Sequence, residues 1–371
     1  METVDVASLT RHVLWAVFVL SALFGAIAQR THFCTMGAVT DIVNFGDWSR
    51  MRMWVLAIGT AMIGFNAMVA LGWVRAGDSV YATERLIWLS NLAGGVVFGF
   101  GMVLASGCGS KSLVRVGGGS LKALVVLLTL SVTSYMTLRG ITAVWRVDSV
   151  DRVALTLPAG QDLPSLLAHA SGAPVPLLAG VLGLAFGGAL VAWALARAEG
   201  RAPETLLGGV GIGAVIVAVW WVSGRMGFVP EHPDTLEPVY LATNTRSMES
   251  LTFVAPIAYA LDWLILFSDA NKRLTLGVVS VFGVVAGSAA WALASRTFRW
   301  EGFGGVEDLA NHIVGAALMG IGGVTAYGCT VGQGLTGVST LALGSFIALG
   351  GIVGGAVLGV RYQAWRLERQ A

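Results

Sequence analysis

The stretch Gly94–Cys108, GGVVFGFGMVLASGC, returns in outline at Gly315–Cys329, GAALMGIGGVTAYGC. With an offset of 221 residues (329 − 108), seven positions are identical, including a G-x-G spacing and the final Gly-Cys. Glycine-rich composition explains part of this likeness, but the shared spacing makes an internal duplication the better interpretation. The sequence therefore predicts two copies of one structural unit, each with a cysteine at the end of an apolar segment.

The composition is that of a membrane protein. Of 371 residues, 56% are hydrophobic and only 12% are charged, whereas a soluble domain averages about 25% charged residues. The apolar residues form runs near the roughly 20 residues needed to cross a bilayer. We expect an all-α polytopic membrane protein with about nine transmembrane helices, near 13–29, 53–72, 88–106, 121–138, 176–196, 207–222, 274–293, 309–327 and 341–360.

The apolar piece 251–267 is a special case, because it contains Pro256 and Asp262. We interpret it as an interfacial or partly inserted helix, and a tenth span is the alternative. Residues 1–28 loosely resemble a signal peptide, but Glu2 and Asp5 do not fit the basic start of one, so a membrane helix is expected there.

Charge gives a weak indication of topology. Alternating the loops between two sides places about 13 Lys and Arg on the side of the C-terminus and about 10 on the other, so the positive-inside bias favours a cytoplasmic C-terminus. The net charge is +2 and the basic residues are dispersed. Nucleic-acid binding is therefore not expected.

An odd number of spans between the two copies would make them run in opposite directions. Inverted repeats with interrupted helices are common in transporters. We expect residues 1–140 to form the first half of one membrane bundle, 141–175 a connecting loop and 176–371 the second half. The polar, glycine-rich links 109–120 and 330–340, and a third segment at 30–46, are predicted to be short re-entrant segments, because irregular backbone at membrane depth must be buried in protein or line a cavity.

The three cysteines lie in RTHFCTMG, SGCGSKS and YGCTVGQ, each at the end of an apolar run. A disulfide would leave one of them unpaired, and no C-x-x-C pattern indicates a metal. No metal or other cofactor is therefore expected. Each cysteine alone could be a small packed apolar residue. The shared position of all three before a polar or glycine-rich turn favours a common role.

These motifs resemble those of the YeeE/YedE sulfur-transport family. The resemblance rests on Gln29–Gly37, Gly107–Gly119 and Gly328–Gly334, together with Glu249–Pro256, and covers nearly the whole chain. It implies a multi-pass protein of the bacterial inner membrane, not an enzyme, that takes up thiosulfate along a pathway with one thiol from each motif. It also implies a small cytoplasmic TusA-like sulfur-carrier protein as a partner. The links 139–175 and 229–250 differ in length from those of shorter family members.

The chemistry of thiosulfate explains why thiols would suit this pathway. Its terminal sulfur is a soft, weak acceptor that a neutral S–H can match, whereas a thiolate would repel the dianion. Helix N-termini would add positive partial charge, and glycines would let the backbone approach the ion closely. The predicted pathway residues are Cys34, Cys108, Cys329, Gly107, Gly109, Gly328, Thr330, Lys111 and Arg30.

Several alternatives stay open. The cargo could be another sulfur or selenium compound, or the protein could be a membrane sulfurtransferase in which a cysteine near Lys111 becomes a persulfide. Lys111, Arg115 and Arg30 could form electropositive mouths, or could pair at the interface with acids such as Asp41. Further polar residues could line the path or serve packing: Gln29, His32, Tyr327 and Gln333. The glycine pairs Gly95–Gly99 and Gly350–Gly354 predict close helix packing.

Overall fold

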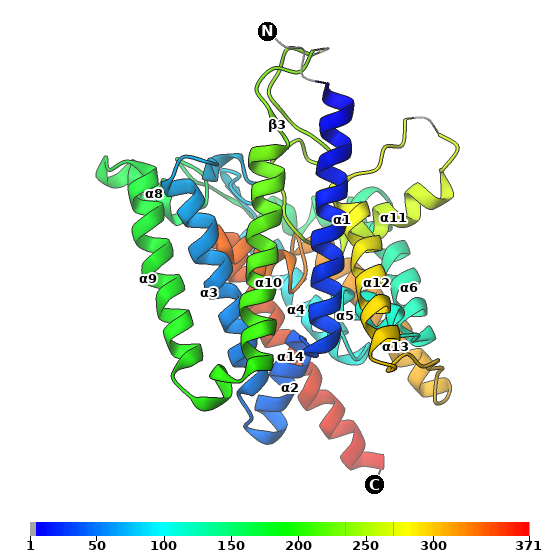
Figure 1. Ribbon diagram of the computed structural model, residues 1–371. Helices are drawn as coiled ribbons and strands as arrows, with labels where there is room; N and C mark the ends of the chain where they lie inside the picture. Colours follow the sequence, from blue (N-terminus) through cyan, green and yellow to red (C-terminus); the bar gives the residue numbers. More distant parts are fainter. Residues whose placement is uncertain (1–4, 234, 270, 371) are drawn as a thin grey trace.

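The computed structural model describes residues 5–233, 235–269 and 271–370, and nearly all regular structure in them is helical (Figure 1). Eight helical segments in these residues are long and apolar enough to cross a membrane. They are built on α1 (Val6–Arg30), α3 (Ser49–Ala70), α4 (Trp88–Leu104), α6 (Leu121–Arg139), α9 (Val175–Leu195), α10 (Pro203–Trp221), α12 (Leu276–Ala294) and α14 (Leu343–Gln370). The prediction of an all-α polytopic membrane protein is confirmed.

The remaining predicted span, 309–327, coincides with α13 (Val306–Thr325), a helix of 20 residues in the same bundle that is not among those eight segments. Its first turn carries Glu307 and Asp308. These acids lower its hydropathy and suit the positive N-terminal end of a helix.

Short helices stand where re-entrant segments and a partly inserted helix were expected. They are α2 (Thr35–Phe45), α5 (Gly109–Gly117), the π-helical turn η5 (Gly332–Gly337) and α11 (Ala255–Ile265). The 11 residues of α11 rise only about 16 Å, which is too short for a tenth span. All six residues of η5 are buried, so protein surrounds this irregular backbone.

The remaining elements are short and lie mostly outside the bundle. Segment 141–175, expected to be a loop, carries α7 (Ile141–Asp148), η2 (Val150–Arg152), β2 (Leu155–Thr156) and α8 (Leu163–Ser171). Strand β2 pairs with β1 (Arg85–Leu86), and β3 (Phe228–Val229) pairs with β4 (Val239–Tyr240), both antiparallel. Three helical turns complete the described elements: η1 (Ala76–Asp78), η3 (Ala198–Arg201) and η4 (Val222–Met226).

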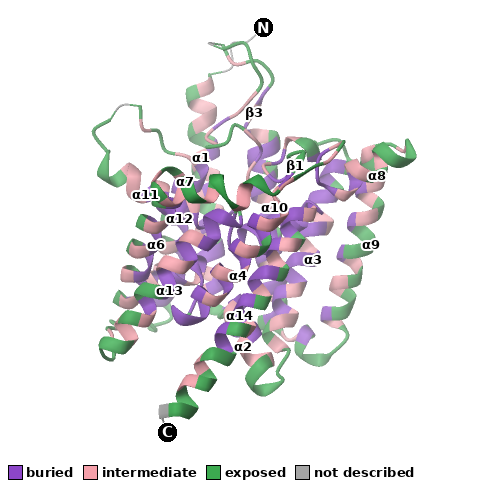
Figure 2. Ribbon diagram, turned by 180° about the vertical axis from the view of Figure 1, so that it is seen from behind, coloured by how far each residue is buried: buried purple, intermediate pink, exposed green. Residues whose placement is uncertain are grey.

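The two ends of the chain lie on opposite sides of the bundle (Figure 1). We call them the N-terminal face, where β3, α8 and α11 lie, and the C-terminal face, where α2 lies. Buried residues concentrate in the middle of the bundle around α4 (Figure 2), whereas α9 at the periphery has only four buried residues. Its exposed leucines and valines are suited to lipid.

Helices α4 and α13 cross in close backbone contact at the centre. A Cβ added to Gly94 would lie 2.7 Å from the Gly322 carbonyl oxygen, and one added to Gly322 would lie 2.7 Å from that of Gly94. In the same way, a Cβ added to Gly101 would lie 2.6 Å from the Gly315 carbonyl oxygen, and one added to Gly315 would lie 2.6 Å from that of Gly101. Since Gly94 corresponds to Gly315 and Gly101 to Gly322 in the repeat, each copy presents the same contact to the other, as across a two-fold axis.

The packing of the other helices follows the same pattern. Helix α4 packs against α14 while α13 packs against α6, and α1 packs against α12 while α10 packs against α3. Each of these pairings has a counterpart in the other half. We propose on this basis that 1–140 and 176–371 are inverted copies joined by 141–175.

One prediction about glycine packing is right and its partner is wrong. Gly95 and Gly99 do pack on the backbone of α14. On α14, however, a Cβ added to Gly350 or Gly354 would meet nothing within 4 Å. The contacts with α4 are made by Gly351 and Gly355. The sequence offers both pairs at the same spacing, and only the rotation of α14 about its axis selects between them.

Candidate functional site

The two Gly-Cys turns have the same backbone. Ser106 and Gly107 have φ of 55° and 159°, and Tyr327 and Gly328 have φ of 63° and 156°. In both turns the glycine N–H bonds the carbonyl five residues earlier. Left-handed backbone at this point ends the apolar helix and favours glycine next to the cysteine.

The motif cysteines come together inside the bundle as free thiols. Cys108 is 2% exposed and Cys329 is completely buried. Thr330 Oγ1 donates a hydrogen bond to Cys108 Sγ (3.2 Å), so the motif of Cys329 touches the motif of Cys108. Cys34 and Cys329 each lie within electrostatic range of Cys108. Cys108 is therefore the thiol that lies near both of the others.

Backbone N–H groups point at two of the sulfurs. Cys34 is the N-cap of α2, and its Sγ accepts from the N–H of Gly37 (3.3 Å). The Sγ of Cys329 accepts from the N–H of Gly332 (3.4 Å). Cys108 is the N-cap of α5, with its sulfur 3.2 Å from Ser110 Oγ. Cys34 and Cys108 thus stand at the N-terminal ends of helices, where positive partial charge gathers.

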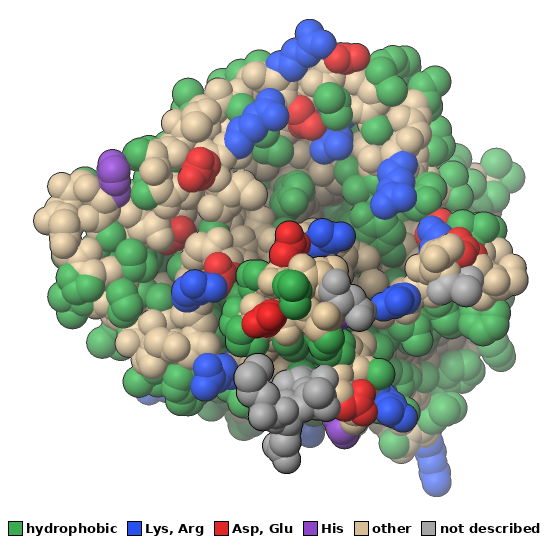
Figure 3. All heavy atoms as spheres, turned by 90° about the horizontal axis from the view of Figure 1, so that it is seen from above, with side chains coloured by type: hydrophobic (Ala, Val, Ile, Leu, Met, Phe, Trp, Pro, Cys, Tyr) green, Lys and Arg blue, Asp and Glu red, His purple; other side chains and the backbone are tan. Residues whose placement is uncertain are grey.

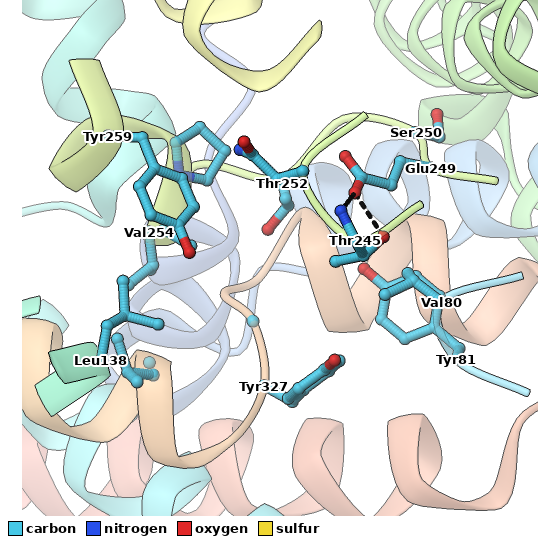
Figure 4. Close-up of a pocket in the computed structure, with 16 residues that line it drawn as sticks. Val80, Tyr81, Leu138, Thr245, Glu249, Ser250, Thr252, Val254, Tyr259 and Tyr327 are labelled. Carbon is cyan, nitrogen blue, oxygen red and sulfur yellow. Dashed lines mark hydrogen bonds between the residues drawn. The ribbon is translucent and has the colours of Figure 1, made fainter. Parts of the chain in front are cut away.

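A cavity of about 160 Å³ is lined by Gly328, the neighbour of Cys329, and by the residues shown in Figure 4. We call it the vestibule. Its lining includes Tyr81, Glu249, Thr252, Tyr259 and Tyr327, and it continues to Gly328, the residue before Cys329. None of the described residues that line it is Lys or Arg.

The carboxyl group of Glu249 is the one acidic side chain in the described lining of the vestibule. It accepts hydrogen bonds from the N–H of Thr245 (3.0 Å) and from Thr245 Oγ1 (2.5 Å), drawn in Figure 4. Burial raises the pKa of Glu249 above its ordinary value, although these hydrogen bonds act in the opposite direction. Its surroundings thus favour the uncharged form more than water would.

A side cavity of about 210 Å³ meets the vestibule at Tyr81 and Tyr327. Amide side chains line it, among them Asn91 and Gln333, which are 4% and 2% exposed. The oxygen of each of these amides has no hydrogen-bond partner among the described residues. Gln333 was considered as lining from sequence, and it does line a cavity beside the cysteines.

Lys111 differs from Arg115 and Arg30, the other two basic residues that could form an electropositive mouth of the pathway. It lies within electrostatic range of Cys34 and Cys108, and its ammonium makes no hydrogen bond or ion pair with the described residues. Arg115 pairs with Glu301 (3.3 Å). Lys111 is thus a basic group without a partner acid beside the thiols.

Arg30 is directed to the periphery rather than to Cys34. Its Nε lies 3.9 Å from Glu204 Oε1, and its guanidinium stands 5.3 Å from the ring centre of Trp291. These are contacts of an exposed side chain that pairs at the interface.

The lining residues of the vestibule that were not predicted include Tyr81, Thr252 and Tyr259. Tyr81 lies within electrostatic range of Cys329. Thr252 and Tyr259 lie in or near the quoted stretch Glu249–Pro256, which was the available signal. Tyr81 belongs to a polar link with no motif, so sequence alone gave no indication of it.

Membrane-crossing helices around a buried row of thiols, with a vestibule at one end, define a polytopic membrane transport protein. The model of the sulphur transport family matches residues 30–358, and the chain belongs to that family. It is similar to the thiosulfate transporter TsuA of Spirochaeta thermophila, 27% identical over 346 residues, covering 90% of this chain and 94% of that protein. It is also similar to the Escherichia coli thiosulfate transporter TsuA, 26% identical over 341 residues and 89% of each.

Proposed function

We propose that this protein takes up thiosulfate across the bacterial inner membrane, as a transporter and not as an enzyme. The observation that carries the proposal is the hydrogen bond of Thr330 to Cys108, which brings two cysteine motifs far apart in sequence into contact inside the bundle. Thiosulfate is the proposed cargo because two relatives, whose similarity covers about nine-tenths of the chain, are named thiosulfate transporters. The positive-inside bias favours a topology with the N-terminal face outside.

The order of the thiols along the proposed path follows from their neighbours. Cys329 adjoins the vestibule through Gly328, Cys108 is the middle thiol, and Cys34 caps α2 on the side of the C-terminal face. Thiosulfate would pass Cys329 first, then Cys108 and then Cys34. Cys329 and Cys108 are at most 2% exposed, so the path is closed in this conformation and transfer needs a local opening.

Weak attraction at each step suits conduction. Neutral thiols donate weak S–H hydrogen bonds to the terminal sulfur of the ion, and the N–H groups of Gly37 and Gly332 add fixed partial charge. A site must attract the ion enough for it to arrive and little enough for it to leave. The glycines beside the cysteines, Gly107, Gly109 and Gly328, keep the backbone accessible to the ion.

Lys111 gives the path a direction in this proposal. Its unpaired ammonium lies near Cys34 and Cys108, the thiols on the side of the C-terminal face. A dianion is therefore attracted more strongly at the inner end than at Cys329. Arg30 would act only on ions that have already left the thiols. A TusA-like carrier on the cytoplasmic side is the proposed recipient of the sulfur.

Uptake of radiolabelled thiosulfate by bacteria that lack their own thiosulfate uptake tests the proposal. Cells that express this chain should accumulate label, and unlabelled thiosulfate should compete better than sulfate, sulfite or selenite. Stronger competition by one of those anions would reassign the cargo. No accumulation at all would refute thiosulfate transport.

A further inference from the structure

The side cavity of about 210 Å³ has hydrogen-bond acceptors in its wall that the described residues do not satisfy. The amide oxygens of Asn91 and Gln333 have no hydrogen-bond partner among those residues, although the two side chains are only 4% and 2% exposed. A buried oxygen without a partner costs free energy. Two such oxygens in one cavity therefore indicate a ligand.

Hydrogen bonds fix the orientation of two of the amide groups that line the cavity. Gln333 Nε2 donates to the carbonyl oxygen of Ala326 (2.6 Å), and a carbonyl can only accept, so Oε1 is the atom left without a partner. Gln161 Oε1 accepts from the N–H of Gly344 (3.1 Å), while its Nε2 donates to Thr83 Oγ1 (2.9 Å). Both oxygens are thus identified by their neighbours.

Gly344 allows the amides of Asn91 and Gln161 to come together. A Cβ added to Gly344 would lie 2.5 Å from Gln161 Oε1 and 2.6 Å from Asn91 Nδ2, so the two side chains occupy space that a larger residue would fill. The lining includes these amide and hydroxyl side chains: Asn91, Gln161, Gln333, Thr83 and Ser345. Segments far apart in sequence therefore supply a set of oxygen atoms to one cavity.

The charge around these oxygens favours a cation over an anion. Acceptor oxygens without partners repel an anion, so the side cavity is not a second place for thiosulfate. Arg85 is the one basic residue of the described lining, and its guanidinium donates at the exposed rim to the carbonyl oxygen of Asp151 (2.7 Å). Asp162, which follows Gln161 in sequence, is 1% exposed, and its Oδ1 has no partner in the described part of the chain.

The kind of cation follows from the ligand atoms. Ca²⁺ and Mg²⁺ are held mainly by carboxylates, whereas the lining offers neutral amide and hydroxyl oxygens, which suit a monovalent ion. Transporters with interrupted helices bind Na⁺ through oxygen atoms near the interruption, at the interface of the two repeats. Gln333 lies in the π-helical turn η5, and Asn91 lies in α4 of the other proposed half. The side cavity therefore has the position and the ligand atoms of a sodium site.

The side cavity and the vestibule share the wall formed by Val80, Tyr81 and Tyr327. The described lining of the vestibule contains no Lys or Arg, so a dianion there would lose hydration without gaining a compensating charge. A cation behind the shared wall would supply that charge at short range. Acidic and basic side chains are interspersed on the N-terminal face, seen from above in Figure 3, so that ions of either sign meet attractive groups there.

We propose that the side cavity binds a sodium ion through the oxygens of Asn91, Gln161 and Gln333, and that this ion and thiosulfate in the vestibule bind cooperatively. The cooperation rests on the proposed transport of thiosulfate, whereas sodium binding does not. Each ion raises the affinity for the other by the same factor. Sodium entering down its gradient would then drive uptake of the dianion.

Thermal unfolding of the purified protein in detergent tests the sodium site without transport. Tm is compared in NaCl, KCl and choline chloride at an equal ionic strength of about 0.1 M. A ligand that binds only the folded protein raises Tm, so NaCl should raise it by a few degrees over choline chloride. N91L, which replaces the amide by an apolar group of similar size, should abolish this shift. N91D, which keeps an oxygen at the site, should retain it.

N44L is the matched control, because Asn44 is exposed on α2 at the C-terminal face. It should respond to sodium as the unmodified protein does. Equal Tm values in the three salts would leave water as the occupant of the cavity and overturn the site. An equal rise in KCl, or a sodium shift that survives in N91L, would overturn it as well. The comparison of salts on the unmodified protein decides even if N91L does not fold.

Initial rates of radiolabelled thiosulfate uptake test the cooperation between the two ions. When choline chloride replaces NaCl outside the cells, the KM of the unmodified protein for thiosulfate should rise about tenfold, and KCl should not restore it. N91L should show the high KM in both salts. A KM that sodium does not change would overturn the cooperation. No uptake in any salt would instead refute the proposed function, and the Tm comparison would still decide whether sodium binds.

Discussion

The turn at Cys108 and the turn at Cys329 have the same backbone but different chemistry around them. Ser106 and Tyr327 share a left-handed conformation, and the glycines that follow differ in φ by only a few degrees. Yet position 111 is a lysine and its counterpart, position 332, is a glycine. The copy near the vestibule is uncharged and the other copy carries an unpaired ammonium.

The difference shows how two copies of one structural unit can give a transport path a direction. The backbone supplies the same N–H groups and the same break in a helix twice, because both copies keep the same glycines. Side chains then distinguish the turn at Cys108 from the turn at Cys329. After Cys108 the chain forms the regular helix α5, whereas after Cys329 it forms the π-helical turn η5. Such π-helical turns are frequent at functional sites.

The largest expected effect comes from separating the two copies at their crossing. G322L would place a side chain where even a Cβ lies 2.7 Å from the carbonyl oxygen of Gly94, so α4 and α13 must move apart. We expect a cost of about 3 kcal/mol or more and the loss of most folded protein. The yield of monodisperse protein in detergent measures this.

Gly354 provides the matched control, since a Cβ there meets nothing within 4 Å. G354L should leave the yield close to that of the unmodified chain. A normal yield for G322L would contradict the view that the crossing of α4 and α13 is the centre of the fold.

A smaller effect is expected when the chemical difference between the copies is removed. K111Q takes away the ammonium near Cys34 and Cys108 and makes both turns uncharged. Thiosulfate uptake should fall about tenfold, equivalent to about 1.4 kcal/mol at the barrier. K111R, which keeps the charge, should retain most of the rate at equal expression. Full activity of K111Q would show that Lys111 does not act on the ion and only extends its side chain to the membrane interface.

The smallest expected effect concerns Glu249, the acidic residue in the lining of the vestibule. Its pKa is raised by burial in the folded protein, so folding favours the protonated form. The stability associated with that proton is present at low pH and is lost as pH rises through the folded-state pKa, above the ordinary value of 4.5. E249Q should therefore raise Tm at pH 8 by a few degrees and change it little at pH 4. A Tm difference that is larger at pH 4 would have the wrong sign for this explanation.

The spans were predictable because each is a continuous apolar run flanked by polar residues. The end of α14 was not, since it continues from residue 360 into the charged sequence up to 370, where hydropathy falls although the helix does not stop. The helices α7 and α8 in the segment 141–175 were missed because, at eight and nine residues, they give no apolar run of membrane length.

Of the candidate site, the sequence predicted the thiols and the glycines but not the walls. The repeat marks Cys108 and Cys329, and their meeting through Thr330 follows from two inverted turns at one crossing. The vestibule takes Tyr81 and Tyr259 from links between spans. No periodicity ties such residues together, because only the tertiary arrangement makes them neighbours.

The most direct test of the central claim is thiosulfate-dependent growth of a bacterium without its own thiosulfate uptake. The strain carries this chain unchanged or with C34S, C108S or C329S, at equal expression. Growth with the unchanged chain and its loss in each variant is the predicted result, since serine has no S–H donor to offer the terminal sulfur. Undiminished growth with all three variants would contradict a path along the thiols and leave the cysteines as packing residues.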